Sequence, residues 1–476
     1  MSKSRSVWGR NLSQPTLKKR IIGWMMFDWA SQPYNTVLLT FIFGPYFAEI
    51  VSNQGISAGV DEAQANANAQ SLWTLGLTIS GIVIALLAPI LGAVADSTGR
   101  RMPYVYAFSF FYILGSAGLW LAYPDASNTV LVLAFFIVGL IGMEFATAFT
   151  NAMLPELGGP SDLGRISGSG WAVGYAGGLV ALVIVLCFLA ENNEGRTLIG
   201  IAPILGLDTE LREGTRSVGP FTALWYFVFM IPFFVWVRRD NNVSVAATGS
   251  VKSGLVGLVK TLRKLPESPS FAAYLGSSML YRDGLSGMYT IGGIYAYGVL
   301  GWSVVDVGIF GILTVAFGAV AAWVGGYADS KYGPKPVIVA CVILLCLAAI
   351  GIVSISRTSI MGLAVSESSA APDIAFYLCG AIIGAAGGVL QAASRTMLVR
   401  QANPTRMTEA FGIYALAGKA TAFLAPALIS LATYLSDSQR IGVSPVLGLF
   451  LFALLLLLWV KPEGEDASKW DAEPSA

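Results

Sequence analysis

The stretch Gly92–Pro103, GAVADSTGRRMP, lies between two long apolar runs, and a related stretch, GGYADSKYGPKP, recurs at Gly325–Pro336. Their aspartates, Asp96 and Asp329, are 233 positions apart in a chain of 476 residues, which is close to half its length. A duplicated acidic turn in matching places of two apolar halves indicates two related bundles of membrane helices.

The composition is that of a membrane protein. Hydrophobic residues make up 55% of the chain, and charged residues make up 12%, against roughly 25% in ordinary soluble domains. The net charge of +1 gives no indication of a nucleic-acid partner. The lipid bilayer is therefore the first partner that we expect.

Twelve apolar segments are long enough to span a membrane, since a spanning helix needs about 20 mostly apolar residues. The predicted fold class is an all-α membrane protein with 12 transmembrane helices in two six-helix bundles. The segments are roughly 21–51, 71–95, 103–122, 129–154, 166–190, 218–237, 271–299, 304–328, 336–355, 373–399, 408–435 and 441–460.

The basic residues predict the orientation. Of the 29 Lys and Arg, 21 fall on the side that carries both ends of the chain and the central linker, and five fall on the opposite side. We therefore expect both termini in the cytoplasm. The predicted divisions are a cytoplasmic segment 1–20, a first bundle 21–237, a linker 238–270, a second bundle 271–461 and a disordered tail 462–476.

The central linker contains apolar residues at helical spacing from Leu255 to Leu265, beside Lys252, Lys260 and other basic residues. This pattern predicts a short amphipathic helix on the anionic membrane surface, and an ordinary solvated connector is the alternative. Segments 52–70 and 191–217 are expected to be outward loops.

The two acidic turns are candidate gates. Asp96 ends a helix, where an anion is unfavourable against the helix dipole, so it needs a partner such as Arg100, Arg101 or a neighbouring helix N-terminus. A bond of this kind can form in one state of a transporter and break in the other. Asp329 and Lys335 are the counterparts in the second copy, which has an extra residue before its glycine and lacks the Arg pair. A static turn is the alternative.

Five charged residues lie deep within the expected helices, and they are the candidates for substrate or proton binding. An ionisable side chain near mid-bilayer costs about 2.5–3.5 kcal/mol, so it usually faces a cavity or a partner. Pro33 follows the first of them and can break its helix. A structural ion pair is the alternative in each case. The five are Asp28, Glu144, Arg282, Asp283 and Lys419.

These five charges sum to one negative charge, so one carboxylate lacks a counter-charge and is a candidate proton carrier. The same set offers a cation to a carboxylate and an anion to an ammonium, which suits a zwitterion. Trp29 and Tyr281 are aromatic candidates for the same cavity. Arg395 is close enough to a helix end to extend toward the cytoplasm, and Glu409 starts a helix, so structural roles are favoured for both.

The residues required for several other functions are missing. The chain contains no histidine, no HExxH, no GxSxG and no phosphate-binding Gly-x-x-x-x-Gly-Lys-Ser/Thr loop. The four cysteines lie in apolar runs without CxxC spacing, which favours packing over metal binding. We therefore expect no enzyme activity, no cofactor and no metal.

Several motifs together resemble a known family. GAVADSTGRR is similar to the signature loop of the major facilitator superfamily. WMMFDWASQPYNTVLLTFIFGPYF, NAMLPEL, GRISGSGWAVGYAGG, YRDG, GGVLQAASRTMLVRQANP and EAFGIYALAGKATAFLAP resemble the vacuole-effluxer branch, which is related to the autophagy-linked vacuolar amino-acid exporters of fungi. The resemblance covers roughly residues 21–461. It implies amino-acid efflux.

The predicted function is secondary active transport of a small solute by alternating access. An amino acid or similar zwitterion is the favoured substrate, with protons as the coupling ion. The alternatives are a non-transporting membrane sensor or partner protein on the same scaffold, and a transporter of a sugar, peptide or drug. We expect a monomer in a bacterial inner membrane.

Overall fold

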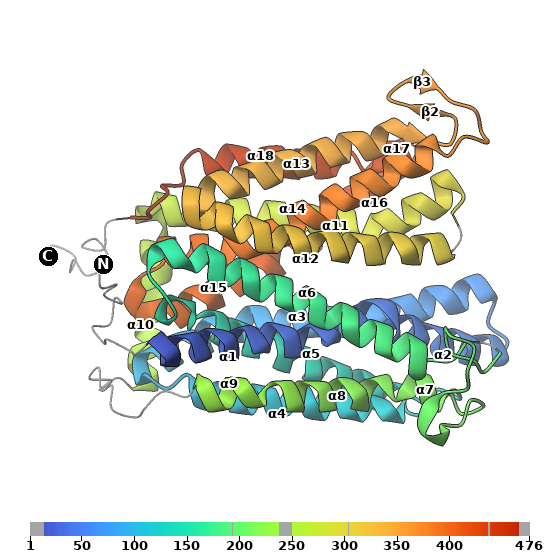
Figure 1. The fold of residues 1–476 in the computed structure, drawn as a ribbon, viewed down its shortest axis with the longest axis horizontal. Helices are drawn as coiled ribbons and strands as arrows, with labels where there is room; N and C mark the ends of the chain where they lie inside the picture. Colours follow the sequence, from blue (N-terminus) through green and yellow to red (C-terminus); the bar gives the residue numbers. More distant parts are fainter. Residues whose placement is uncertain (1–13, 193, 238–249, 303, 437, 466–476) are drawn as a thin grey trace, which may run out of the picture.

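The computed structural model describes residues 14–192, 194–237, 250–302, 304–436 and 438–465. The long helices run along roughly one common direction, as Figure 1 shows. Eleven of the described helical segments are long and apolar enough to cross a membrane. The predicted class, an all-α membrane protein, is confirmed.

The N-terminal part of the chain, residues 14–237, forms the first six expected segments; η1 is a π-helix and the other short η elements are 3-10 helices. The elements are α1 (Gln14–Pro33), η1 (Tyr34–Phe41), α2 (Phe43–Ser57), α3 (Glu62–Thr98), α4 (Met102–Gly118), η2 (Leu119–Leu121), α5 (Thr129–Asn151), η3 (Leu154–Glu156), α6 (Pro160–Phe188), η4 (Ile204–Gly206), α7 (Glu213–Arg216), α8 (Val218–Phe229) and α9 (Ile231–Trp236).

The C-terminal part, residues 250–465, contains the linker helix, the remaining segments and one small antiparallel sheet in the order β1-β2-β3. The elements are α10 (Val251–Lys264), η5 (Leu265–Glu267), α11 (Pro269–Leu300), α12 (Val304–Tyr332), α13 (Pro334–Ser354), β1 (Ile355–Ser356), β2 (Ser359–Ile360), β3 (Leu363–Ala364), α14 (Ala371–Gln401), η6 (Pro404–Arg406), α15 (Met407–Ala420), α16 (Leu424–Ser436), α17 (Gln439–Gly442) and α18 (Pro445–Leu457).

The expected seventh segment corresponds to α11. This helix has 32 residues, but it carries Arg282 and Asp283 and is not among the eleven apolar segments. The count of twelve spans therefore stays a prediction.

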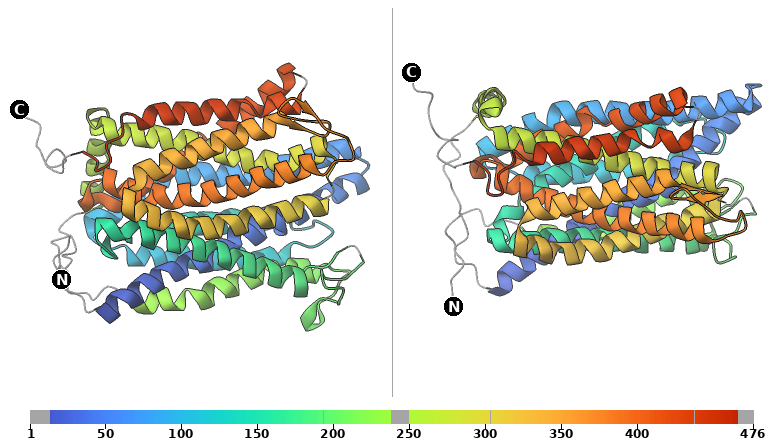
Figure 2. Two further views of the ribbon diagram at one scale, coloured as in Figure 1. Left: turned by 45° about the horizontal axis from the view of Figure 1, so that its top comes forward. Right: turned by 90° about the horizontal axis from the view of Figure 1, so that it is seen from above.

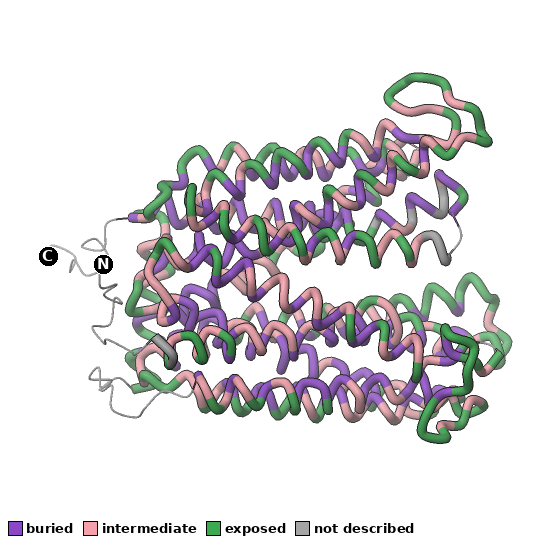
Figure 3. Tube along the Cα trace, viewed as in Figure 1, coloured by how far each residue is buried: buried purple, intermediate pink, exposed green. Residues whose placement is uncertain are grey.

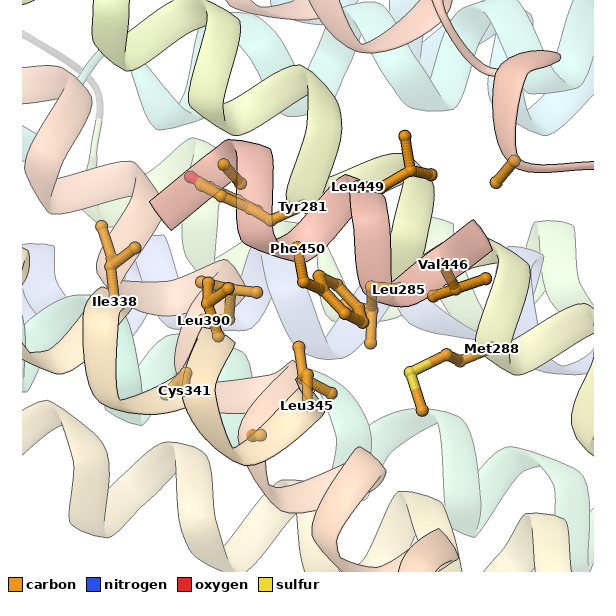
Figure 4. Close-up of a cluster of buried hydrophobic side chains, with 14 of the residues drawn as sticks. Tyr281, Leu285, Met288, Ile338, Cys341, Leu345, Leu390, Val446, Leu449 and Phe450 are labelled. Carbon is orange, nitrogen blue, oxygen red and sulfur yellow. The ribbon is translucent and has the colours of Figure 1, made fainter. Parts of the chain in front are cut away.

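Buried side chains form two hydrophobic clusters. One contains residues of the N-terminal part alone, and the other contains residues mainly of α11, α13, α14, α15, α16 and α18 together with Ala93, Ala152 and Leu258. Figures 1 and 2 show the corresponding two groups of helices, with α15 between them. Figure 3 shows that buried residues line the surfaces where helices face one another. Figure 4 shows how α11, α13, α14 and α18 contribute Leu285, Leu345, Leu390 and Phe450 to the second cluster.

Glycines permit two close crossings between the parts. A Cβ added to Gly92 of α3 would lie 2.4 Å from the backbone oxygen of Thr408 at the start of α15. A Cβ added to Gly168 of α6 would lie 2.5 Å from the backbone oxygen of Ala322 of α12. Because only glycine permits these approaches, α3 packs closely on α15 and α6 on α12.

The structure corrects three expectations about segment ends. The prediction of a loop over residues 52–70 is wrong, because α2 runs to Ser57 and the Ala-rich segment that follows begins α3. Asp61 caps the start of α3 by accepting a hydrogen bond from the backbone N–H of Ala63. The described structure also continues beyond residue 462, where the disordered tail was predicted to start, and Glu463 forms an ion pair with Arg400 at 2.6 Å. Residues 466–476 lie outside the described part.

The third difference concerns Pro33, which was expected to break the first membrane helix. Pro33 ends α1, and the π-helix η1 follows it directly. The interruption comes later, at Ile42, with φ −121° and ψ −65°. π-Helical stretches occur often at functional sites, so this segment remains of interest.

Candidate functional site

The first acidic turn joins the two parts of the chain at one end of the molecule. Gly99 ends α3 with a φ of 65°, which lets the chain reverse before α4. Arg101 Nη2 donates to Asp96 Oδ1 at 3.0 Å, and the backbone N–H of Glu409 donates to Asp96 Oδ2 at 2.8 Å. The anion at the end of α3 thus lies at the start of α15, where the helix dipole favours it.

Arg101, and not the exposed Arg100, is therefore the basic partner of Asp96. It also pairs through Nη1 with Glu156 Oε1 at 3.0 Å, and Arg20 Nη2 lies 3.4 Å from the other oxygen of Glu156. The turn is thus connected to α1 and to η3, which follows α5. We call the Asp96, Arg101 and Glu409 contacts the latch, and its role as a gate stays a prediction.

The second acidic turn is arranged differently. Asp329 accepts a hydrogen bond from Thr396 Oγ1 of α14, which belongs to the same part of the chain. The contact across the parts comes from the next residue, because Ser330 Oγ accepts from the backbone N–H of Arg165 at 2.8 Å. Lys335 Nζ donates to the backbone oxygen of Val460 at 2.7 Å, beyond the end of α18. The structure thus does not bring Lys335 together with Asp329.

A buried ion pair joins α1 to α14. Arg395 Nη1 lies 3.0 Å from Asp28 Oδ2, and it also donates to Asn151 Oδ1 at 3.0 Å. The guanidinium stacks over the rings of Trp24 and Trp171, at 5.2 and 4.7 Å from the centroids. The Arg395 side chain is 3% exposed, so the expectation that it extends toward the cytoplasm is wrong. The helices α1, α5 and α6 cover it.

A second ion pair joins α5 to α15. Lys419 Nζ lies 2.6 Å from Glu144 Oε1, and the two side chains are 27% and 26% exposed. Arg282 of α11 donates to the backbone oxygen of Tyr414 at 3.1 Å and stacks over its ring at 4.3 Å. A Cβ on Gly418 would lie 2.5 Å from the Arg282 guanidinium, so the glycine makes room for it. We call Glu144, Lys419 and Arg282 the charge cluster.

Asp283 remains without a cationic partner among the described ion pairs. Its residue is 3% exposed, and its Oδ2 has no hydrogen-bond partner among the described residues. It lies in α11 beside Arg282. The expected eleventh membrane segment is not one continuous helix. It is interrupted just after Lys419, because α15 ends at Ala420 and α16 starts at Leu424.

The two aromatic candidates lie in packed positions. Tyr281 is fully buried, and its hydroxyl forms a 2.7 Å hydrogen bond with Ser394 Oγ. Trp29 stacks on Trp225 with centroids 5.7 Å apart. Among the described contacts, neither side chain hydrogen-bonds to a residue of the two ion pairs, and the place of Trp29 and Tyr281 in a transport cavity stays a prediction.

The sequence reasoning missed Arg395, Asn151 and Tyr414 as partners of the charged groups. With Arg395 included, the deep charges comprise three carboxylates and three cations, so their sum is zero, but Asp283 still has no partner among the described ion pairs. Trp24, which lies one turn before Asp28, was the available signal, because an aromatic ring beside a buried anion suits an arginine. Among the described residues, no group of acidic residues and cysteines could hold a metal ion.

Comparisons with known proteins place the chain in a family. The profile of the family described as "Vacuole effluxer Atg22 like" matches residues 16–163 and 161–467. The chain belongs to this family. YxiO of Bacillus subtilis (strain 168), described as an uncharacterized MFS-type transporter, is 22% identical over 448 residues, which cover 92% of this chain and 94% of that protein.

Fungal relatives are also similar to this Atg22-like chain. Autophagy-related protein 22 of Coccidioides immitis (strain RS) is 23% identical over 313 residues, covering 62% of this chain and 47% of that protein. The chain therefore matches about half the length of this relative. The predicted resemblance to the vacuole-effluxer branch of the major facilitator superfamily is confirmed.

Solved structures agree on the fold. The proton:xylose symporter XylE, bound to 6-bromo-6-deoxy-D-glucose, gives a TM-score of 0.65 at 12% identity, covering 94% of this chain and 97% of that one. The transporter FucP in its outward conformation gives a TM-score of 0.64 at 14% identity, covering 93% of this chain and 98% of that one. These likenesses show the major facilitator fold, and the Atg22-like chain is an MFS-type transporter.

Proposed function

We propose that this transporter moves a small zwitterion, with an amino acid as the favoured substrate, by secondary active transport and alternating access. The observation that supports the proposal best is the Glu144–Lys419 ion pair between α5 and α15. Burying charges within membrane helices costs about 2.5–3.5 kcal/mol each on insertion scales, so such groups generally have a function. The two side chains are also each about a quarter exposed, which supports access by a solute.

The charge cluster suits a zwitterion for a simple reason. When a substrate separates Glu144 from Lys419, its carboxylate can accept from Lys419 and its ammonium can donate to Glu144. No charge is then left unpaired within the membrane. Arg282 supplies a second cation for the substrate carboxylate.

Asp28 and Arg395 are proposed to have a different role. Arg395 is almost fully buried and is already held by Asp28, Asn151 and two tryptophan rings. A substrate would have to displace several partners at once. We therefore assign this pair to holding α1 against α14 in the present state.

Proton coupling is proposed to use Asp283. A buried carboxylate without a partner is costly, whereas the neutral acid is tolerated. Asp283 has an unpartnered oxygen, and it neighbours Arg282 of the charge cluster. Protonation and deprotonation of Asp283 would thus change the charge beside the substrate.

The wider organisation follows the same proposal. The two bundles are residues 21–237 and 271–461, joined by the linker 238–270, and the latch closes the cytoplasmic end. The excess of Lys and Arg at that end supports cytoplasmic termini. We also propose a monomer in a bacterial inner membrane without enzyme activity, and net efflux as its direction.

Exchange in proteoliposomes tests the proposal. Vesicles loaded with an unlabelled amino-acid pool should take up labelled amino acid with wild-type protein and not with Glu144→Gln. Glu210→Gln, in an exposed loop, is the matched control and should keep full exchange. Asp283→Asn should keep exchange but lose net flux driven by a pH gradient.

Absence of amino-acid exchange in folded wild-type protein would contradict the substrate class. Sugars, peptides and drugs would then be tested in the same vesicles. If none of these solutes exchanged, the sensor or partner function would be favoured over transport.

A further inference from the structure

A second polar site lies at the latch end of the molecule, apart from the charge cluster. A cavity of about 330 Å³ lies between α10 and the start of α15. The basic and neutral polar residues of its lining come from two short stretches of the chain, one in α10 and one around η6. These residues are Lys260, Thr261, Lys264, Asn403, Thr405 and Arg406.

The lining suits a phosphate group. Three cations face one carboxylate, Glu409, which already pairs with Arg406 at 3.3 Å. The hydroxyl and amide groups add neutral hydrogen-bonding capacity. Phosphates are bound by combinations of this kind, and basic pockets at the cytoplasmic side of membrane helices bind lipid headgroups.

The apolar part of the lining favours a lipid over a free ion. Phe271, Ala410 and Ile413 complete the wall of the cavity, so a ligand with an apolar portion beside its phosphate would fill it better than phosphate alone. The glycerol and upper acyl chains of a phospholipid supply that portion.

The orientation of α10 places the site where headgroups occur. Figures 1 and 2 show α10 running across the direction of the membrane helices. Val256 and Val259 on its outer face are 61% and 48% exposed, and Lys252 and Arg263 lie beside them. A basic helix with such a face lies in the plane of the membrane surface.

The inner face of α10 contacts both sides of the latch. A Cβ on Gly254 would lie 2.9 Å from the backbone oxygen of Ala93 in α3. A Cβ on Gly257 would lie 2.5 Å from Arg406 Nη1, and Arg406 also donates to Thr261 of α10 at 3.3 Å. Since α10 touches α3 and η6 together, anything that fixes α10 opposes their separation.

We propose that this cavity binds the phosphate of an anionic phospholipid headgroup, and that the bound lipid holds α10 across the contact between α3 and α15. The lipid bridges Lys260 of α10 to Arg406 of η6. Binding at this site does not depend on the identity of the transported substrate.

Titration of the purified protein in detergent tests the site. Short-chain phosphatidylglycerol should raise the melting temperature, and phosphatidylcholine with the same chains should not. Lys260→Gln should weaken the apparent affinity about fivefold, as expected for one basic residue at a lipid surface. Lys252→Gln is the matched control, because Lys252 is exposed on the same helix but does not line the cavity.

The outcomes are distinct. Equal weakening by Lys252→Gln and Lys260→Gln would overturn the site in favour of diffuse surface charge. Inorganic phosphate that stabilises as well as the lipid, and competes with it, would overturn the lipid as the source of the phosphate. Hydrogen exchange of the α10 amides should slow when the lipid is added, and unchanged exchange would overturn the effect on α10.

Discussion

Replacing Gly92 with alanine should force the latch end of the transporter apart. The new Cβ would lie 2.4 Å from the Thr408 backbone oxygen and 2.8 Å from its carbonyl carbon, whereas ordinary contacts begin near 3.4 Å. Both atoms belong to the backbone, so no side-chain rotation relieves the clash. The helices α3 and α15 must therefore separate by about 1 Å, and overpacking of this size costs about 1–3 kcal/mol.

This cost applies only to the state in which α3 and α15 are in contact. The ratio of the closed to the open latch should therefore fall about 5- to 150-fold. Spin labels at Arg100→Cys and Lys331→Cys, both exposed and on different parts of the chain, report the separation at that end. The partly exposed Cys187 is first replaced with alanine.

The matched control is Gly81→Ala, on the same helix, where an added Cβ has no neighbour within 4 Å. Gly92→Ala should lengthen the distance between the labels, and Gly81→Ala should leave it unchanged. An unchanged distance in folded Gly92→Ala protein would refute the reasoning. Equal lengthening in both variants would also refute it, since that result would reflect a general effect on α3.

Three further predictions concern charged groups. Glu144→Lys and Lys419→Glu should each lose amino-acid exchange, because two like charges then face each other within the membrane at a cost of roughly 2 kcal/mol or more, and the double swap should restore part of the exchange. The melting temperature of Arg395→Lys should lie between those of the wild type and Arg395→Ala, because lysine keeps the charge opposite Asp28 but loses the planar stacking. A melting temperature as low as that of Arg395→Ala would contradict this prediction. Burial raises the pKa of Glu191 above its usual value, with Thr215 opposing the shift. The folded state thus binds the proton of Glu191 more tightly than the unfolded state does, so the stability of the fold should fall as the pH rises above about 4.5. Thermal unfolding of Glu191→Gln should lack this part of the pH dependence.

The membrane helices could be predicted because their signal is local. Runs of about 20 apolar residues fix most spans within a few residues, and the pairing of Asp96 with Arg101 links positions only five apart. The same locality explains the error at 52–70. An Ala-rich, polar stretch such as 62–70 favours a helix through propensity, even where it is too polar for a membrane span.

The partners of the charged groups could not be predicted in the same way. Asp28 and Arg395 are 367 positions apart, and Glu144 and Lys419 are 275 apart. The depth of a residue estimated from the sequence is only its distance from the end of its own helix. It does not reveal that α1, α5 and α6 cover the end of α14, and this covering is what buries Arg395.

The contrast between the two ion pairs bears on specificity. The Glu144–Lys419 side chains are each about a quarter exposed, whereas Arg395 is 3% exposed, so a solute reaches the first pair with far less rearrangement. A solute with a carboxylate alone would pair with Lys419 and leave Glu144 without a partner, and an amine would do the reverse. Each outcome costs roughly 2–3 kcal/mol, which corresponds to about 30- to 150-fold discrimination in favour of a zwitterion. The charge cluster would thus select its substrate mainly by the penalty that it imposes on solutes with one charge.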